Sequence, residues 1–240
     1  GGASLTTLIT VLGLLLWEEI PVYWAIDFAN PATRRDATNQ LTELVRRDRN
    51  RASVIIWSIG NENPDTDARL DFMQGLAATA RAEDPTRLIA AACLISHAKL
   101  KIEDRLAGAL DIIGINEYYG WYDENFDELA IIGRNSAPDR PVVISETGAD
   151  GDHEKGPERG LFSTAYQSEV YEKQIATLSD LDYIKGISPW ILYDFRVERR
   201  QNVFQRGWNR KGLIAADKQT RKPAFGLLAA HYAERASKEE

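Results

Sequence analysis

SVIIWSIGNENP, residues 53–64, is the stretch that decides the fold of this chain. Its first half is a run of valine, isoleucine and tryptophan, and such a continuous apolar run is typical of a parallel strand buried on both faces. Its second half is polar, so Glu62 comes directly after the strand. PVVISETG, residues 141–148, repeats the pattern and places Glu146 after a second apolar run. In a barrel of parallel strands, residues at these strand ends point into the mouth, where functional groups gather.

Strand-like and helix-like segments alternate along the whole chain. The apolar runs predict strands at about 12–17, 53–59, 88–95, 111–115, 141–145 and 184–192. Periodicity and cap residues predict helices at 33–48, 66–82, 104–110, 123–134, 165–181 and 222–236. This alternation, with no hairpin signal between the segments, indicates βαβ units and a parallel sheet.

Two α/β architectures fit these units. One is an open doubly wound sheet, and the other is a (β/α)8 TIM barrel that lacks its first two units. A dinucleotide-binding sheet would carry a glycine-rich loop after its first strand, and none follows here. The loops after the predicted strands are long and rich in Trp, Tyr, Asn and Glu, which favours a barrel mouth. No linker is visible, so residues 1–240 are predicted to form one partial barrel domain.

The bulk composition is that of an ordinary globular protein, with 44% hydrophobic and 27% charged residues. Its net charge of -7 argues against nucleic acid or an anionic membrane as a partner. The apolar segment 5–17 is shorter than the roughly 20 residues that span a bilayer, so we interpret it as a helix end followed by a strand. Cys93 is expected to be a small buried hydrophobe. A single cysteine is compatible with any compartment, and a soluble, cytoplasmic protein is our expectation.

The spacing of the two glutamates suggests a shared site. A βα unit takes roughly 25–30 residues, so about three units separate Glu62 from Glu146. Three steps around an eight-stranded ring place the two carboxylates across the mouth from each other. Two facing carboxylates are the minimum for hydrolysing a glycosidic bond. The competing interpretation is that Asn61, Glu62 and Glu146 only satisfy turn and cap groups or pair with arginines.

Aromatic residues gather in the same predicted loops. INEYYGWY, residues 115–122, follows a predicted strand and brings together four aromatic residues, Tyr118 and Trp121 among them. Aromatic faces stack on the C–H faces of sugars, so this loop is a candidate sugar platform. Trp190 and Trp208 admit the same interpretation. The alternative for all of them is a hydrophobic patch that seals the top of the barrel.

The loop GWNRKGL, residues 207–213, offers Asn209 and Lys211 to a carboxylate or a hydroxyl. Because four arginines lie nearby in the sequence, a solvated basic loop is the alternative that spacing alone favours. No metal site is expected, since the three histidines show no ligand spacing and no HExxH or CxxC occurs. No cofactor is expected either.

Together these motifs resemble the catalytic barrel domain of glycoside hydrolase family 2. The stretches that carry the resemblance run in family order over most of the chain: LGLLLWEEIP, SVIIWSIGNENP, DPTR, DIIGINEYYGWY, PVVISETGAD, WILYDFR and NRKGLIAADKQTRKPAF. The resemblance implies a retaining β-glycosidase that acts on carbohydrate, with no nucleic acid or membrane as partner. It favours a β-glucuronidase, because NRK matches the Asn-x-Lys pattern that grips a sugar carboxylate. A β-galactosidase of the same family and a barrel fragment that binds sugar without turnover are the alternatives.

The resemblance also implies roles for single residues. Glu62 would be the general acid/base after barrel strand 4, and Glu146 the nucleophile after strand 7. Asn61 would bind the sugar 2-hydroxyl, Tyr118 would sit beside the nucleophile, and Trp190 would form the floor under the sugar. The substrate would further be bound by three residues of the aromatic and basic loops, Trp121, Asn209 and Lys211. Retention would require carboxyl groups about 5–5.5 Å apart.

The sequence departs from the family pattern in two respects. Thr147 follows the nucleophile position, where the family usually has tyrosine. The chain also begins near what should be the second helix, so barrel strands 1 and 2 and the preceding β-domains are expected to be missing. A barrel without two strands would expose two sheet edges, which invites pairing with another chain, and a homo-oligomer is therefore among the expected assemblies.

Overall fold

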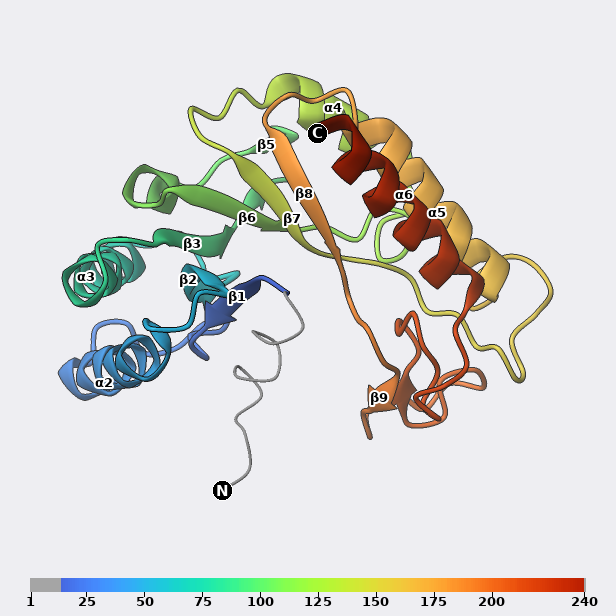
Figure 1. The fold of residues 1–240 in the computed structure, drawn as a ribbon, viewed down its shortest axis with the longest axis horizontal. Helices are drawn as coiled ribbons and strands as arrows, with labels where there is room; N and C mark the ends of the chain where they lie inside the picture. Colours follow the sequence, from blue (N-terminus) through green and yellow to red (C-terminus); the bar gives the residue numbers. More distant parts are fainter. Residues whose placement is uncertain (1–13, 240) are drawn as a thin grey trace. The chain divides into compact units, whose positions relative to one another are not determined.

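The computed structural model describes residues 14–239 (Figure 1). Most of the segment predicted at 5–17 lies outside these residues. Helices and strands alternate as the sequence predicts. The longer strands are β1 (Leu16–Glu19), β2 (Val54–Asn61), β3 (Leu88–Cys93), β6 (Ile112–Asn116), β7 (Val142–Thr147) and β8 (Ile184–Pro189). The helices are α2 (Pro31–Asp48), α3 (Asp67–Glu83), α4 (Phe126–Asn135), α5 (Thr164–Leu178), α6 (Pro223–Glu239) and the 3-10 helix η1 (Arg105–Ala109).

Two compact units share these elements. The first runs to Asn116 and includes Ser136–Val143, and the second consists of Glu117–Asn135 and the chain from Ile144 onward. Strand β7 begins in the first unit and ends in the second. The prediction of a single domain stays a prediction.

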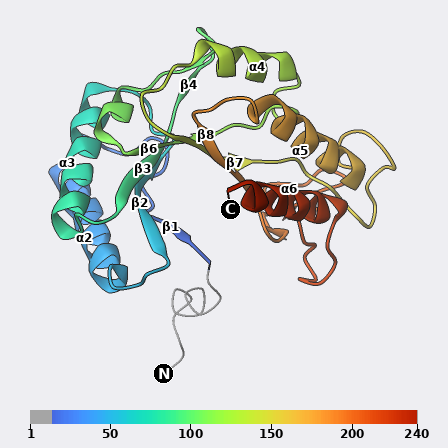
Figure 2. The same ribbon diagram turned by 45° about the horizontal axis from the view of Figure 1, so that its top comes forward.

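The first unit is built on parallel strands. Its strands pair in the order β1-β2-β3-β6, and the β1–β2, β2–β3 and β3–β6 pairs are parallel. Helices α2 and α3 lie side by side in Figures 1 and 2 and contact each other. Ile56, Ala90 and Ile112 come from three of the strands and form one buried cluster. This arrangement explains the continuous apolar runs, because such strands are covered on both faces.

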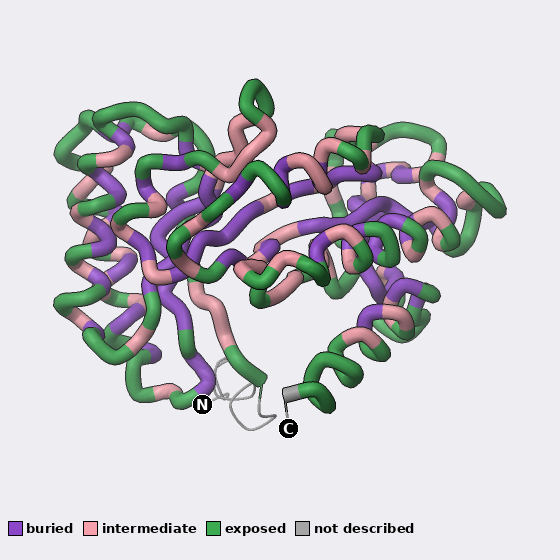
Figure 3. The backbone as a smooth tube through the Cα atoms, turned by 90° about the horizontal axis from the view of Figure 1, so that it is seen from above, coloured by how far each residue is buried: buried purple, intermediate pink, exposed green. Residues whose placement is uncertain are grey.

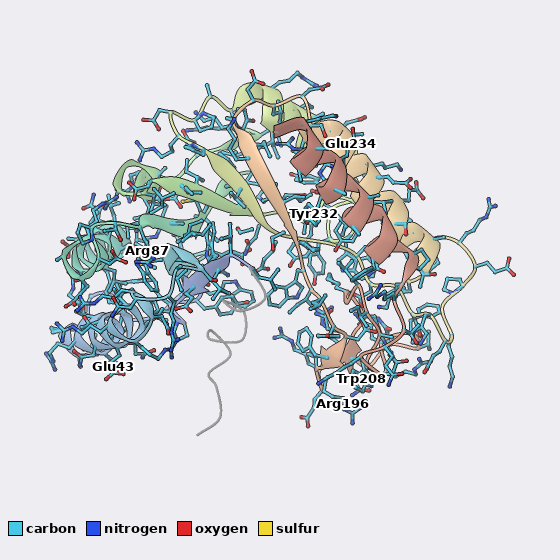
Figure 4. All side chains as sticks on the ribbon, in the orientation of Figure 1. Glu43, Arg87, Arg196, Trp208, Tyr232 and Glu234 are labelled. Atoms are coloured by element: carbon cyan, nitrogen blue, oxygen red, sulfur yellow. The ribbon has the colours of Figure 1, made fainter. Side chains whose placement is uncertain are left out.

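Local signals in the sequence set the helix ends of the first unit. Asn30 accepts a hydrogen bond from the backbone nitrogen of Ala32 at 2.8 Å, and Pro31 opens α2. Thr66 caps α3 by accepting from the backbone nitrogen of Arg69 at 3.2 Å. Asp84 follows α3. Burial alone would raise the pKa of Asp84, but hydrogen bonds from Thr86, Arg87 and Trp57 lower it to about 2. Figure 4 labels Arg87, whose guanidinium lies 5.8 Å from the Trp57 ring centroid.

The second unit packs two helices over a small core. Helices α5 and α6 lie side by side, and Tyr171 of α5 packs with Leu213, Ala224 and Leu228. The second half of α6 is exposed (Figure 3). The end of β7 is tied to the end of β8, because the backbone nitrogen of Trp190 donates to the Thr147 oxygen at 2.7 Å.

Two short antiparallel strand pairs occur although the sequence shows no hairpin signal. Strands β4 (Ile95–Ser96) and β5 (Lys101–Ile102) pair in the first unit, and β9 (Phe195–Arg196) and β10 (Trp208–Asn209) pair in the second. These strands have two residues each, too few for an alternating pattern to show in the sequence. Figure 4 labels Arg196 and Trp208, and the Arg196 guanidinium lies 5.1 Å from the Trp208 ring centroid. The segment 104–110, expected as a short helix, is the 3-10 helix η1.

Among the described residues, no helix has the length and the apolar character needed to cross a membrane.

A buried ion pair joins α3 to η1. The guanidinium of Arg69 donates to both carboxylate oxygens of Asp104, at 2.6 and 2.9 Å, and both side chains are fully buried. Asp104 also accepts from the backbone nitrogens of Leu94 and Leu106. Removing one partner of such a pair leaves an uncompensated charge in a nonpolar interior.

We therefore expect Asp104→Ala to lower the free energy of unfolding by about 3–5 kcal/mol. Arg105→Ala is the matched control, because the exposed Arg105 pairs with Asp65 and Asp67 at the surface, where ion pairs contribute little. Urea unfolding of both variants measures the difference. Equal losses in the two variants would contradict the role assigned to the buried pair.

Candidate active site

Glu62 stands directly after β2 in a distinctive backbone conformation. Its φ of 51° lies in the left-handed region, which is uncommon for a residue other than glycine and recurs at functional sites. Its backbone nitrogen donates to the Ala92 oxygen at 3.0 Å, which fixes the turn to the neighbouring strand β3. Its carboxylate accepts a hydrogen bond from the indole nitrogen of Trp24 at 2.8 Å. The side chain is therefore oriented before any substrate binds.

Asn61 is the last residue of β2 and is 7% exposed. Its side-chain oxygen accepts from the amide of Asn116, at the end of β6, at 2.8 Å. That bond assigns the orientation of the Asn61 amide, whose nitrogen stays available as a donor.

Glu19 is a third carboxylate at a strand end, and the sequence reasoning missed it. It ends β1 and accepts a hydrogen bond from the Ser58 hydroxyl at 2.6 Å. The residue as a whole is exposed, yet desolvation of its carboxyl raises the pKa of Glu19. Hydrogen bonds from Ser58 and Trp17 oppose this rise in pKa, and the negative charge of Glu62 adds to it. The signal was present in the sequence, because LGLLLWEEIP also ends an apolar run with carboxylates.

Glu146 belongs to the second unit and lies inside β7, next to its last residue, rather than just beyond the strand. Its carboxylate accepts a hydrogen bond from the Tyr118 hydroxyl at 2.8 Å. Its backbone oxygen accepts from the backbone nitrogen of Glu117 at 3.0 Å. The loop after β6 is thus tied to β7 through both backbone and side chain, and it holds Tyr118 against Glu146.

Lys211 is buried, which excludes the interpretation of its loop as solvated. Asn209, Arg210 and Lys211 are only 3%, 5% and 1% exposed. The Lys211 ammonium donates to Asp150 at 2.6 Å and to the Tyr122 hydroxyl at 3.3 Å. Asn209 supports the turn by accepting from the backbone nitrogen of Lys211 at 3.0 Å.

Aromatic rings surround this ammonium group. Its nitrogen lies 4.6 Å from the ring centroid of Trp121, 4.7 Å from that of Tyr122 and 5.8 Å from that of Tyr118. A cation among aromatic faces is attracted by their quadrupoles. The aromatic loop and the basic loop, chosen separately from the sequence, therefore form one cluster.

Asp150 is the second residue that sequence reasoning missed. It is completely buried, and its other carboxylate oxygen accepts from the Gln205 amide at 2.6 Å and from the backbone nitrogen of Arg210 at 3.3 Å. Its position four residues after Glu146 in PVVISETGAD was the available signal.

The other two candidate sugar-stacking tryptophans, Trp190 and Trp208, contact side chains close to them in the sequence. Trp190 follows β8, and its ring meets Phe195 edge to face, with centroids 6.3 Å apart. Trp208 lies in β10 beside the guanidinium groups of Arg196 and Arg210, at 5.1 and 5.6 Å from its ring centroid. These contacts give Trp208 a structural role in its hairpin.

Cys93 is free and buried, as expected, and burial raises the pKa of its thiol. In residues 14–239, no group of three or more His, Cys, Asp and Glu side chains is placed to hold a metal ion.

Comparison with known proteins decides the family. Residues 9–235 match the family model described as glycosyl hydrolases family 2, TIM barrel domain. The chain belongs to this family. It is 30% identical over 222 residues to a β-glucuronidase of Paenibacillus borealis, covering 87% of this chain and 35% of that protein. It is 29% identical to the β-glucuronidase of Mus musculus, covering 90% of this chain and 34% of that protein.

Solved structures agree on the fold. A family 2 β-galacturonidase from Eisenbergiella tayi superposes with a TM-score of 0.83 at 22% identity, covering 95% of this chain and 42% of that chain. Bacteroides uniformis β-glucuronidase 2 superposes with a TM-score of 0.75 at 28% identity, covering 90% and 28% of the two chains. The fold is therefore that of the family 2 TIM-barrel domain, and an open doubly wound sheet is excluded. The chain spans about a third of the length of the curated relatives it matches.

A buried carboxyl, that of Glu117, directly follows β6 and lies beside Glu146, whose backbone oxygen accepts from the Glu117 nitrogen. Glu117 is 3% exposed and accepts hydrogen bonds from the Gln174 amide and the backbone nitrogen of Tyr119, both at 3.0 Å. Burial raises the pKa of Glu117 to about 7, and the hydrogen bonds from Tyr119 and Gln174 limit the rise.

This raised pKa predicts a pH dependence of stability. The folded chain holds the Glu117 proton up to about pH 7, whereas the unfolded chain releases it near pH 4.5, the ordinary pKa of a glutamate. The wild-type protein should therefore lose about 3 kcal/mol of unfolding free energy, relative to Glu117→Gln, as the pH rises through that window. Above about pH 7, the difference in unfolding free energy between the two proteins should be constant.

Urea unfolding at several pH values measures this difference. Glu124→Gln, at an exposed position of the same loop, is the control and should follow the wild type at every pH. Parallel curves for wild type and Glu117→Gln would show that Glu117 does not titrate in this range.

Proposed function

We propose that this chain contributes the catalytic barrel of a retaining β-glycosidase that acts on β-glucuronides. One observation carries the proposal. A single loop, residues 118–122, holds the candidate nucleophile through Tyr118 and surrounds the candidate carboxylate-binding lysine with Trp121 and Tyr122. The same loop therefore couples the reacting group to the group that would recognise an acidic sugar.

The proposed reaction is a double displacement. Glu146 attacks the anomeric carbon while Glu62 gives its proton to the departing glycosidic oxygen, so the aglycone leaves as an alcohol. Glu62, now ionised, then takes a proton from the water that attacks the glycosyl ester and frees Glu146. The hydrogen bond from Tyr118 supports this assignment, because it stabilises the ionised form of Glu146.

Asn61 is proposed to bind the sugar 2-hydroxyl. Its oxygen is already occupied by the Asn116 amide, so its nitrogen is the group that it can offer to the substrate. Hydrogen bonds to this hydroxyl strengthen in the transition state of glycoside hydrolysis.

Lys211 and Asn209 are proposed to select the uronic acid. The Lys211 ammonium can donate a charge-assisted hydrogen bond to a carboxylate, and the aromatic rings around it keep water away from that bond. The β-glucuronidase names of the relatives, at 27–30% identity, support this choice over the β-galactosidase alternative.

A covalent label tests the nucleophile. Bacteroides uniformis β-glucuronidase 2 has been solved covalently bound to cyclophellitol-6-carboxylate aziridine. We expect this reagent to esterify Glu146 of the present chain, as mass spectrometry of its peptides would show, and to leave Glu146→Gln unlabelled. Attachment at another residue, or equal labelling of the variant, would remove Glu146 as the nucleophile.

A leaving-group series tests Glu62. Glu62→Gln should hydrolyse aryl β-glucuronides of weakly acidic phenols about 10²–10⁴-fold more slowly than the wild type, because those phenols must be protonated as they leave. Strongly acidic phenols need no proton, so the loss should shrink for them. A loss that does not vary with the acidity of the phenol would contradict a general-acid role.

Lys211→Met tests the substrate class. We expect the ratio of glucuronide to galactoside hydrolysis to fall at least about tenfold, since the charge-assisted bond to the carboxylate is lost. The ratio is the measurement because the substitution also leaves Asp150 buried and unpaired, and partial unfolding lowers both rates equally. An unchanged ratio of glucuronide to galactoside hydrolysis would mean that Lys211 does not bind the carboxylate.

A further inference from the structure

Arg200 reaches the Lys211 cluster from a different loop. It lies between β9 and β10, and its backbone is fixed by hydrogen bonds to the Val197 oxygen at 3.0 Å and from the Gly207 nitrogen at 2.6 Å. Its guanidinium donates to the Tyr122 hydroxyl at 2.9 Å. Arg200 and Lys211 therefore converge on one oxygen atom, although no sequence pattern distinguishes Arg200 from its neighbouring arginines.

The charge of Lys211 is already balanced. Its ammonium lies 2.6 Å from Asp150, and both side chains are buried, so the pair is nearly neutral when seen from the substrate side. Deeper in the same unit, Lys222 and Arg210 share Asp194, at 2.7 and 3.8 Å. Lys211 can give direction to a bound carboxylate, but it adds little net attraction for an anion.

Arg200 has no such counter-charge. Among the ion pairs of residues 14–239, none includes Arg200, and the Tyr122 hydroxyl is the hydrogen-bond partner of its side chain. A guanidinium carries five N–H donors in a fixed fork, so most of its donors are left for a ligand. A half-buried arginine with unused donors is well suited to binding a carboxylate in a two-point geometry.

The Tyr122 hydroxyl links the two cations. Its oxygen accepts from both Lys211 and Arg200, which leaves its own hydrogen free to be donated to an anion. The Tyr122 side chain is exposed; partial desolvation of its hydroxyl alone would raise the pKa of Tyr122, but the positive charges and hydrogen bonds of Lys211 and Arg200 outweigh it and lower the pKa. The environment of this oxygen thus favours negative charge.

We propose that Arg200 is a specificity-determining residue of this site: it supplies the unbalanced positive charge that makes the site select sugars bearing a carboxylate. Lys211 orients the carboxylate, Tyr122 donates to it, and Arg200 attracts it. The inference rests on the proposed function, because it concerns the acidic group of the same substrate.

The experiment uses two ligands that cannot be cleaved, phenyl 1-thio-β-D-glucuronide and its neutral counterpart phenyl 1-thio-β-D-glucoside. Calorimetry of the full chain gives the affinity for each, at low and at high salt. The variants are Arg200→Ala, Arg200→Lys and Lys211→Met, with Arg199→Ala as the matched control. Arg199 is the adjacent arginine and is exposed, so its removal changes the net charge by the same amount.

We expect Arg200→Ala to bind the glucuronide at least about tenfold more weakly than the wild type, with glucoside binding unchanged. Arg199→Ala should stay close to the wild type, and Arg200→Lys should recover part of the affinity because it keeps the charge. The salt dependence of glucuronide binding should be smaller in Arg200→Ala, since an accessible charge is screened by salt.

Two other outcomes distinguish failure of the role of Arg200 from failure of the proposed function. Equal glucuronide affinities for Arg200→Ala and Arg199→Ala, with a loss in Lys211→Met, would overturn the role of Arg200 and leave the proposed function standing. A wild-type protein that binds the two ligands equally well would overturn both the proposed uronide preference and this inference.

Discussion

Parallel backbone pairing is the constraint on which the chemistry of this chain depends. Strands that run in the same direction end at the same edge of their sheet, so residues far apart in sequence become neighbours there. In the first unit this pairing brings Asn61 and Asn116 into hydrogen-bond contact at 2.8 Å. In the second unit the bond from the Trp190 nitrogen to Thr147 places Trp190 beside the strand end that carries Glu146.

Buried charges are the second organising feature. An ammonium and a carboxylate are costly to bury singly, and Lys211 and Asp150 are tolerated because each satisfies the other. For binding, the consequence is that Lys211, the obvious candidate to bind an anion, is already neutralised by Asp150. In the proposed site, attraction of an acidic ligand then falls to a cation without such a partner, and we propose that Arg200 is that cation.

Local signals in the sequence predicted most of the elements. Pro31 at the start of α2, and Thr66 before α3, located the helix starts to within a few residues. The apolar runs located the longer strands, because strands covered on both faces admit few polar residues. The hairpins β4–β5 and β9–β10 escaped prediction, since two-residue strands in loops carry no periodicity. Glu19 and Asp150 escaped as well, although both lie close to the end of an apolar run.

The resemblance of the sequence to family 2 determined the barrel fold. Local order and composition determined the strand-end positions of Asn61 and Glu62 and the presence of an aromatic loop and a basic loop. Only the tertiary structure decided that the basic loop is buried, that Asp150 neutralises Lys211, and that Tyr122 joins Lys211 to Arg200. The physical reason is that desolvation and charge balance depend on which distant side chains surround a group, and no local pattern encodes them.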